Sequence, residues 1–286
     1  MSTTNPKTIV FVTGAFVTHH GWSEWQKYFE SKGYKTVAPS WPNKEGTAAE
    51  LRAKHPLGNP GLADLSLAEL VDHYANVVKS FPEKPIVIGH SLGGLVTQII
   101  LNRDLAAAAV AIHPVPPQGV FPYELSFLRS TWRVLGLFTS LKKTYVMSPE
   151  KWKYAFTNQM SSAEQQKTWE ENVVPESKKT ARGGLTSQAK VDFKKAHAPL
   201  LITSGDLDHT IPAHLNRRNF NAYKKRTDSV LEYKEFAGRN HFVLGQSTWK
   251  EDADYILDWL TRQFVPTTSF NSAGSNNVQK TAGIVS

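Results

Sequence analysis

Cysteine is absent from this chain of 286 residues. That absence excludes disulfide frameworks, cysteine-ligated metal sites, iron–sulfur clusters and thiol nucleophiles. Long apolar runs are missing too: the longest, Leu105 to Ile112, has eight residues, whereas a transmembrane helix needs about 20. The first residues show no basic segment followed by an apolar stretch and a cleavage site, so no secretory signal is expected. We therefore expect a soluble protein that resides in the cytoplasm.

Motifs for common cofactors are also absent. The sequence has no H-E-x-x-H, no G-x-G-x-x-G after a strand and no G-x-x-x-x-G-K-[ST], which argues against zinc-protease, dinucleotide and P-loop nucleotide sites. Asp206, Asp208, His209 and His214 could be combined into a metal site, but the carboxylates have a more specific use, described below. We expect no metal and no cofactor.

Positive charge is concentrated in one part of the chain. The net charge is +8, from 33 Lys and Arg against 25 Asp and Glu, and residues 129–195 hold thirteen basic and six acidic residues. Such a stretch is either a patch that attracts anionic substrates or nucleic acid, or a solvated helical surface. Because no nucleic-acid-binding motif accompanies the charge, we favour the solvated surface and expect no nucleic-acid partner.

Short apolar segments alternate with helical patterns along the chain. Near-continuous apolar strands suit a sheet covered on both faces, and strand–helix alternation indicates right-handed crossovers. The sequence therefore predicts an α/β fold with an open, mostly or wholly parallel sheet of about six strands and helices on both faces. The predicted strands are Thr8–Thr13, Lys35–Ala38, Pro85–Gly89, Ala108–Ile112, Leu200–Ser204 and Val230–Phe236, and the predicted helices are Trp22–Lys32, Leu67–Ser80, Leu92–Asp104 and Trp249–Phe264.

Two segments depart from this alternation. Residues 113–198 contain no convincing strand, and a compact domain rarely carries a structureless loop of that length, so we predict a helical insertion there. Twelve of the 21 residues in 266–286 are Ser, Thr, Asn or Gly, a composition that cannot offset the entropy of ordering. The expected organisation is a core of residues 1–112 and 199–265, an insertion of residues 113–198 and a disordered tail.

The most specific motif is Gly89-His90-Ser91-Leu92-Gly93, which fits G-x-S-x-G. It follows an apolar strand and opens an apolar helix, which is the context that this motif requires. A sharp strand-to-helix turn holds the serine in a strained conformation, and small residues on both sides avoid collisions. We therefore predict that Ser91 is a nucleophile at the carboxyl edge of the sheet.

A serine nucleophile needs a base that a carboxylate orients. Asp206 and Asp208 follow the strand Leu200–Ser204, and His241 follows the strand Val230–Phe236. All three groups therefore belong at the same edge of the sheet as Ser91, in the order Ser–Asp–His. The other nine histidines lack this placement, and we expect most of them to be solvent-facing or structural.

These motifs resemble those of the α/β-hydrolase superfamily over essentially all of residues 7–265, in the style of its esterase-like and cofactor-free haloperoxidase-like members. The family's acid follows the pattern Gly-x-x-Asp-x-x-Val/Ile-Pro, which selects Asp208 over Asp206. Its histidine occupies a loop like Gly-Arg-Asn-His-Phe, which selects His241. The resemblance also implies that the insertion is a cap over the serine.

An oxyanion hole should complete the site, because the tetrahedral intermediate needs hydrogen-bond donors. One donor should be the backbone N–H of Leu92, directly after the nucleophile. In the family the second comes from a loop that often begins His-Gly; here Thr13 replaces the histidine, and the residue after Gly14 is Ala15, with Phe16 as the second candidate. Because the donor is a backbone group, loss of the histidine leaves the chemistry intact.

The aromatic residues of the insertion would line an apolar acyl or alcohol pocket under a cap, although packing of the cap's own core explains many of them equally well. The predicted function is a serine hydrolase acting on a carboxylic ester, or a related lactone, thioester or amide, through an acyl-enzyme. The alternatives are lyase or perhydrolase chemistry on the same three residues, or a non-catalytic small-molecule binding protein. The sequence leaves the oligomeric state open. The aromatic residues are Phe121, Tyr123, Phe127, Trp132, Phe138, Trp152, Tyr154, Phe156 and Trp169.

Overall fold

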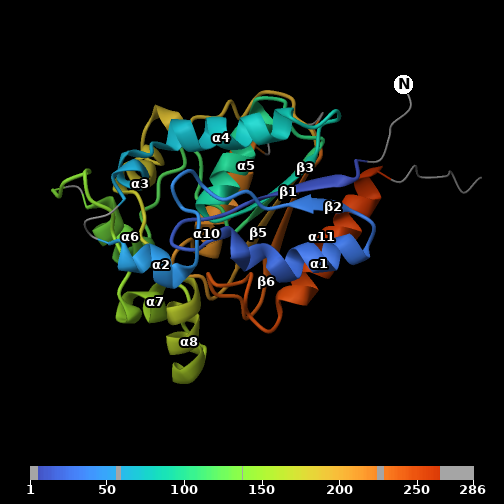
Figure 1. The fold of residues 1–286 in the computed structure, drawn as a ribbon. Helices are drawn as coiled ribbons and strands as arrows, with labels where there is room; N and C mark the ends of the chain where they lie inside the picture. The colour runs from blue at the N-terminus through green and yellow to red at the C-terminus, as the bar shows by residue number, and fades with distance from the viewer. Residues whose placement is uncertain (1–5, 56–58, 137, 224–228, 265–286) are drawn as a thin grey trace, which may run out of the picture.

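A six-stranded parallel sheet forms the centre of the computed structural model, which describes residues 6–55, 59–136, 138–223 and 229–264. The spatial order of the strands is β2-β1-β3-β4-β5-β6, and Figure 1 shows helices in front of and behind the sheet. This arrangement confirms the predicted fold class and the six predicted strands. Their bounds are β1 Thr8–Val12, β2 Lys35–Val37, β3 Ile86–His90, β4 Ala108–Ile112, β5 Leu200–Gly205 and β6 Leu231–Phe236.

Both faces of the sheet are buried because alternate strand residues point into two separate cores. On β1, Val10 and Val12 pack with helices α4 (Leu67–Lys79) and α5 (Leu92–Asn102). Ile9 and Phe11 point the other way, toward helices α1 (Ser23–Ser31) and α11 (Trp249–Phe264). The central strands are therefore apolar over most of their length, and polar residues such as His90, Thr203 and Ser204 come near their carboxyl ends.

The four predicted helices are these same α1, α4, α5 and α11, with bounds within two residues of those expected. A capping box precedes α4: Ser66 accepts from the Glu69 N–H, and the Glu69 side chain accepts from the Ser66 N–H. The core half of the chain also contains shorter elements that the apolar pattern did not predict. They are η1 His19–Trp22, α2 Ala48–Ala53, α3 Pro60–Asp64 and α10 Ala213–Tyr223.

The segment between β4 and β5 is helical, and in its described part no strand joins the sheet. Figure 1 shows α6, α7 and α8 grouped at one end of the molecule, opposite α11. Trp152 and Phe156 of this segment form a small core with Phe16 and Val17, which follow β1. The segment therefore packs over the carboxyl end of the sheet. Its elements are α6 Leu125–Leu135, α7 Pro149–Ala155, α8 Ser162–Asn172, α9 Lys178–Gly183 and η2 Ser187–Ala189.

Two further predictions concern the termini and membranes. The tail predicted to be disordered, residues 266–286, lies outside the described residues. Among the helices that are described, none has the length and apolar character needed to cross a membrane.

Candidate active site

Ser91 occupies the turn between β3 and α5 in a strained conformation, with φ of 57° and ψ of −121°. The positions of the glycines explain how the chain keeps this turn. A Cβ at Gly89 would overlap the Thr97 hydroxyl and the Gly93 carbonyl, and a Cβ at Gly93 would overlap the carbonyl oxygen of Val12. Only glycine therefore lets β1, β3 and α5 approach closely enough to fix the serine, which is the physical basis of the G-x-S-x-G pattern.

The structure brings Ser91, His241 and Asp208 into one hydrogen-bonded chain. His241 Nε2 lies 2.9 Å from Ser91 Oγ, and His241 Nδ1 lies 2.7 Å from Asp208 Oδ2. All three side chains are buried. An ionised carboxylate can only accept, so Nδ1 carries the proton toward Asp208 and Nε2 is left to accept from the serine hydroxyl. This is the tautomer that a general base at His241 requires.

Asp208 is held as a carboxylate by several donors. Its Oδ1 accepts the backbone N–H groups of Thr210 at 2.8 Å and Ile211 at 2.7 Å, and its Oδ2 accepts from both His241 and His113. Burial alone raises the pKa of the Asp208 carboxyl, but His241 and His113 outweigh that effect and hold the pKa below its ordinary value. The alternative acid, Asp206, instead accepts the Gly238 N–H at 2.7 Å.

Two further histidines, not anticipated as part of the site, surround this carboxylate and imidazole. His113 directly follows β4 and donates from Nδ1 to Asp208 Oδ2 at 2.9 Å. His90 is the last residue of β3, and its ring centroid lies 4.8 Å from that of His241. Burial, followed by the neighbouring histidines His241 and His113, holds the pKa of His90 well below its ordinary value, so it remains neutral. Because His90 and His113 also stand at strand ends, strand-end placement alone does not single out His241.

The loop after β1 carries the two candidates for the second oxyanion donor. Ala15, Phe16, Ser91 and Leu92 all line one cavity. The Phe16 N–H donates to Glu176 Oε2 at 2.8 Å, whereas the described residues provide no acceptor for the Ala15 N–H. Leu92 is the first residue of α5, so its N–H precedes the helix's own hydrogen-bond ladder. Ala15 and Leu92 therefore both border the cavity with backbone N–H groups at positions where a donor can act.

Distant side chains fix the conformation of this loop. The Tyr74 hydroxyl accepts from the Thr13 N–H at 3.3 Å, and Trp41 Nε1 donates to the Thr13 carbonyl at 3.0 Å. On the other side of Ala15, the Phe16 carbonyl accepts from the Val174 N–H at 2.9 Å. Phe16 itself has a φ of 68°, a conformation that a phenylalanine adopts only when its surroundings impose it.

Glu176, which holds the Phe16 N–H, belongs to a fully buried ion pair. Its Oε2 lies 2.6 Å from Lys44 Nζ, and the two side chains are 0% and 1% exposed. Burial lowers the pKa of Lys44, and Glu176 opposes that shift. Buried charges are costly unless they are paired and hydrogen-bonded. Lys44 thus holds the Glu176 side chain in place, so the pair ties the β4–β5 segment to the loop that carries Ala15.

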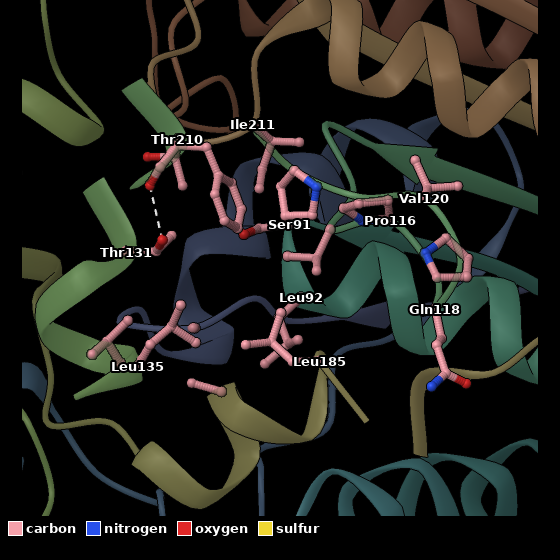
Figure 2. Close-up of a pocket in the computed structure, with 18 of the residues that line it drawn as sticks. Ser91, Leu92, Pro116, Gln118, Val120, Thr131, Leu135, Leu185, Thr210 and Ile211 are labelled. Atoms are coloured by element: carbon pink, nitrogen blue, oxygen red, sulfur yellow. Dashed lines mark hydrogen bonds between the residues drawn. The ribbon is translucent and has the colours of Figure 1, made fainter. Parts of the chain in front are cut away.

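An apolar cavity of about 150 Å³ opens beside Ser91. Figure 2 shows Ser91 and Leu92 with Ile211 on one side and Leu135 and Leu185 on the other. Of the nine aromatic residues proposed for a pocket, Phe121, Phe127 and Phe156 line it, while Trp152 and Trp169 pack within the β4–β5 segment. The remaining residues lie elsewhere: Tyr123, Trp132 and Phe138 are exposed, and Tyr154 packs on His209.

The four residues considered as metal ligands line one surface pocket, but among the described residues their ligand atoms do not form a cluster of metal-binding size. His209 Nδ1 hydrogen-bonds the Tyr154 carbonyl, and His214 Nε2 lies 3.3 Å from Glu124. In the described part of the chain, one trio, His113, Asp208 and His241, has ligand-type atoms within 4.8 Å of one another. Those atoms are hydrogen-bonded to each other through Asp208 Oδ2.

Comparison with known proteins supports the fold. A family model described as the alpha/beta hydrolase family matches residues 9–252. No curated protein sequence is significantly similar to the chain. A monoacylglycerol lipase from Paleococcus ferrophilus superposes with a TM-score of 0.65 at 22% identity, covering 91% of this chain and 96% of the lipase.

Two other solved structures share the fold at lower identity. A methylesterase from Arabidopsis has a TM-score of 0.62 at 14% identity, with 89% of this chain and 99% of the esterase covered. A pyrethroid hydrolase from Sphingobium faniae has a TM-score of 0.59 at 17% identity, with 89% and 97% covered. The family model spans most of the sequence, and these neighbours share the overall fold of the chain. The chain therefore belongs to the alpha/beta hydrolase family.

Proposed function

We propose that the protein is a serine hydrolase that cleaves carboxylic esters through a covalent acyl-enzyme. The observation that carries the proposal is the unbroken hydrogen-bond chain from Asp208 through His241 to Ser91, with distances of 2.7 and 2.9 Å. A carboxylate and a histidine that are hydrogen-bonded in this order can activate a serine hydroxyl, which is otherwise a poor nucleophile. The esterase and lipase names of the structural neighbours support the same class of reaction.

The first half of the reaction forms the acyl-enzyme. Ser91 Oγ attacks the ester carbonyl while its proton passes to His241 Nε2, and Asp208 stabilises the resulting imidazolium. The carbonyl oxygen becomes an oxyanion, and the backbone N–H groups of Ala15 and Leu92 donate hydrogen bonds to it. The C–O bond to the alcohol then breaks, and His241 returns the proton to the departing alkoxide.

The second half regenerates the serine. Water attacks the acyl carbonyl, and His241 Nε2 takes one of its protons. The same two N–H groups hold the second oxyanion, and collapse of the intermediate releases the acid as the proton returns to Ser91 Oγ. His90, kept neutral by burial, adds no second charge beside the imidazolium at either stage.

The cavity supports a substrate with an apolar acyl or alcohol group. Apolar side chains of the β4–β5 segment and of the sheet loops dominate its lining, among them Val120, Phe127, Leu135, Leu185 and Ile211. We therefore assign residues 113–198 as a cap that covers the serine and selects the substrate. Because the cavity borders both Ser91 and the proposed oxyanion donors, a bound apolar group lies next to the scissile bond.

The experiment is a panel of esters that vary in acyl and alcohol size, assayed with the wild type, Ser91→Ala and Ser80→Ala. Ser80 ends α4 and donates its hydroxyl to the Val77 carbonyl, so its variant is a matched control. We expect Ser91→Ala to lose about 10⁶-fold in kcat with an unchanged melting temperature. Retention of kcat within tenfold would overturn the proposal.

The same assay distinguishes related chemistries. A cyanohydrin, and acetate with peroxide, are included as substrates with product analysis. The proposal expects ester cleavage to be faster than either reaction. Faster Ser91-dependent release of cyanide or formation of peracetic acid would contradict ester hydrolysis as the main reaction. The same serine, histidine and aspartate would then catalyse a different reaction.

A further inference from the structure

Large hydrophobic side chains are exposed mainly in one region of the described structure. Eight such residues are exposed, and six of them fall between positions 121 and 138. Exposure reaches 83% for Leu125, 57% for Trp132 and 92% for Phe138. Concentrated apolar exposure of this kind marks an interaction surface rather than the scattered apolar residues of an ordinary surface. We call this region the α6 face, defined by Phe121, Tyr123, Leu125, Leu128, Trp132 and Phe138.

Helix α6 has apolar residues on two sides. Leu125, Leu128 and Trp132 are spaced by three and four residues, so they lie along one exposed side. Phe127 and Val134 are buried on the other side and line the cavity beside Ser91. Phe121 is both exposed and part of the cavity lining, so the α6 face continues into the cavity. Figure 1 places α6 at the edge of the molecule, away from the helices that cover the sheet.

Positive charge accompanies the α6 face. Residues 125–149 contain four basic side chains, Arg129, Arg133, Lys142 and Lys143, and no acidic one, and all four are exposed. Arg129 lies over the Tyr154 ring while remaining exposed, and Lys151 donates to the Arg129 carbonyl. Some basic residues of the stretch 129–195 therefore make contacts within the protein. Others are exposed in the same part of the chain as the apolar side chains of the α6 face.

The positive charge of the α6 face indicates which kind of partner can bind there. A second copy of the chain would bring the same four cations against one another, with no acidic residue between positions 125 and 149 to offset them. An anionic lipid surface satisfies both features at once: aromatic and aliphatic side chains enter the interface while Lys and Arg contact the headgroups.

We propose that the α6 face docks on anionic lipid surfaces and presents the cavity mouth to esters held in the lipid. Presentation of the cavity mouth to esters rests on the proposed hydrolase function, whereas docking does not, because docking needs no turnover. Ser91→Ala therefore serves as the background for all binding measurements, which also keeps the vesicle lipid intact.

The experiment is co-sedimentation of the Ser91→Ala chain with vesicles of phosphatidylcholine alone or mixed with phosphatidylglycerol. We expect at least about tenfold tighter binding to the anionic vesicles, weakened by added salt. The double change Leu125→Ser/Trp132→Ser should weaken binding at least about tenfold. Val230→Ser is the matched control, because Val230 is 49% exposed outside the α6 face, and it should leave binding unchanged.

A second pair of variants isolates the charge. Arg129→Gln/Arg133→Gln should weaken binding to anionic vesicles about 25-fold, from about fivefold for each cation at the surface. Lys32→Gln/Lys79→Gln removes two exposed charges from α1 and α4 and should have no effect. Lys32 and Lys79 lie outside the proposed surface, so equal losses from both pairs would show non-specific attraction and overturn the proposal.

Folding and competing occupants are tested in parallel. In the chain that retains Ser91, the Leu125→Ser/Trp132→Ser change should leave hydrolysis of a short soluble ester and the melting temperature unchanged, since neither side chain lines the cavity. Absence of vesicle binding overturns the docking proposal whether or not esters are cleaved. Light scattering that shows a dimer dissolved by Leu125→Ser/Trp132→Ser would assign the α6 face to self-association, and it would overturn the proposal as well.

Discussion

Two loops that meet at Ser91 are held in place by different means. The Asp208 loop is fixed by its own next residues, because the N–H groups of Thr210 and Ile211 bind its carboxylate. The loop that carries Ala15 is fixed from far along the chain, by Trp41, Tyr74 and Glu176. Local contacts leave a recognisable motif, whereas long-range contacts do not. The Asp208 loop, which we call the acid–base side of the site, can therefore be predicted from the sequence. The contacts that hold the loop carrying Ala15, the oxyanion side, cannot.

The largest effect should come from the acid–base side. Asp208→Asn removes the charge that stabilises the His241 imidazolium and permits the wrong imidazole tautomer, so kcat should fall about 10⁴-fold. Asp206→Asn is the matched control, since Asp206 contacts the Gly238 N–H instead of a histidine, and it should change kcat less than about threefold. Steady-state hydrolysis by the two variants makes the comparison. A larger loss from Asp206→Asn would reverse the assignment of the acid.

A smaller effect should follow from loosening the oxyanion loop. Lys44→Met/Glu176→Gln and Lys44→Met/Glu176→Met both remove the buried ion pair, but only the first retains an oxygen that accepts the Phe16 N–H. Because a single oxyanion donor contributes about 10²–10³ in rate, we expect the second variant to have about 10²-fold lower kcat than the first, with a smaller change in KM.

Matched melting temperatures would establish that the two double variants differ in the loop rather than in folding. Equal kcat values for two folded variants would show that the hydrogen bond from Phe16 to Glu176 does not position Ala15. That result would remove the distinction between local and long-range support on which the comparison of the two loops depends.

His113 should have a more modest effect. His113→Phe removes one of the two imidazole donors to Asp208 Oδ2 and leaves the Thr210 and Ile211 N–H groups in place. We expect kcat/KM to fall about tenfold. Loss of this donor raises the pKa of Asp208, so the stability that the ionised carboxylate provides should be lost at a higher pH in acid denaturation. A simple loss of packing would lower stability without moving that pH.

The smallest effect concerns stability and pH. The pKa of Asp208 is lower in the folded protein than its ordinary value of 3.8, so the unfolded chain binds the proton first as the pH falls. The stabilisation from the ionised carboxylate is therefore complete above pH 3.8 and decreases below it. The difference in free energy of unfolding between wild type and Asp208→Asn should narrow on acidification in denaturant titrations. A constant difference would contradict the depressed pKa.

Most of the fold could be predicted because its signals are local. The strands are short apolar runs, and α4 begins at a capping box that two residues define. Helix α10 was missed because Asn216 and Asn219 occupy its buried side, so no apolar periodicity marks the helix. Short helices such as α2 and α3 provide too few turns for a period to emerge.

The residues of the site likewise divide into those that a local sequence pattern predicts and those that it does not. The turn at Ser91 and the Gly-x-x-Asp-x-x-Ile-Pro segment around Asp208 are continuous in sequence, and the structure brings these residues and His241 together. Lys44 and Glu176 are separated by 132 residues, so their pairing could not be inferred from either neighbourhood. His113 is the intermediate case: its position directly after a predicted strand is visible in the sequence, but no motif around it indicates the contact with Asp208.

The central claim is that Ser91 is an activated nucleophile. Its most direct test is the intact mass of the protein after incubation with a fluorophosphonate, measured for the wild type and for Ser91→Ala. The account predicts a single phosphonyl adduct on the wild type, mapped to the peptide that contains Ser91, and none on the variant. An unmodified wild type, or an equal adduct on both proteins, would contradict it.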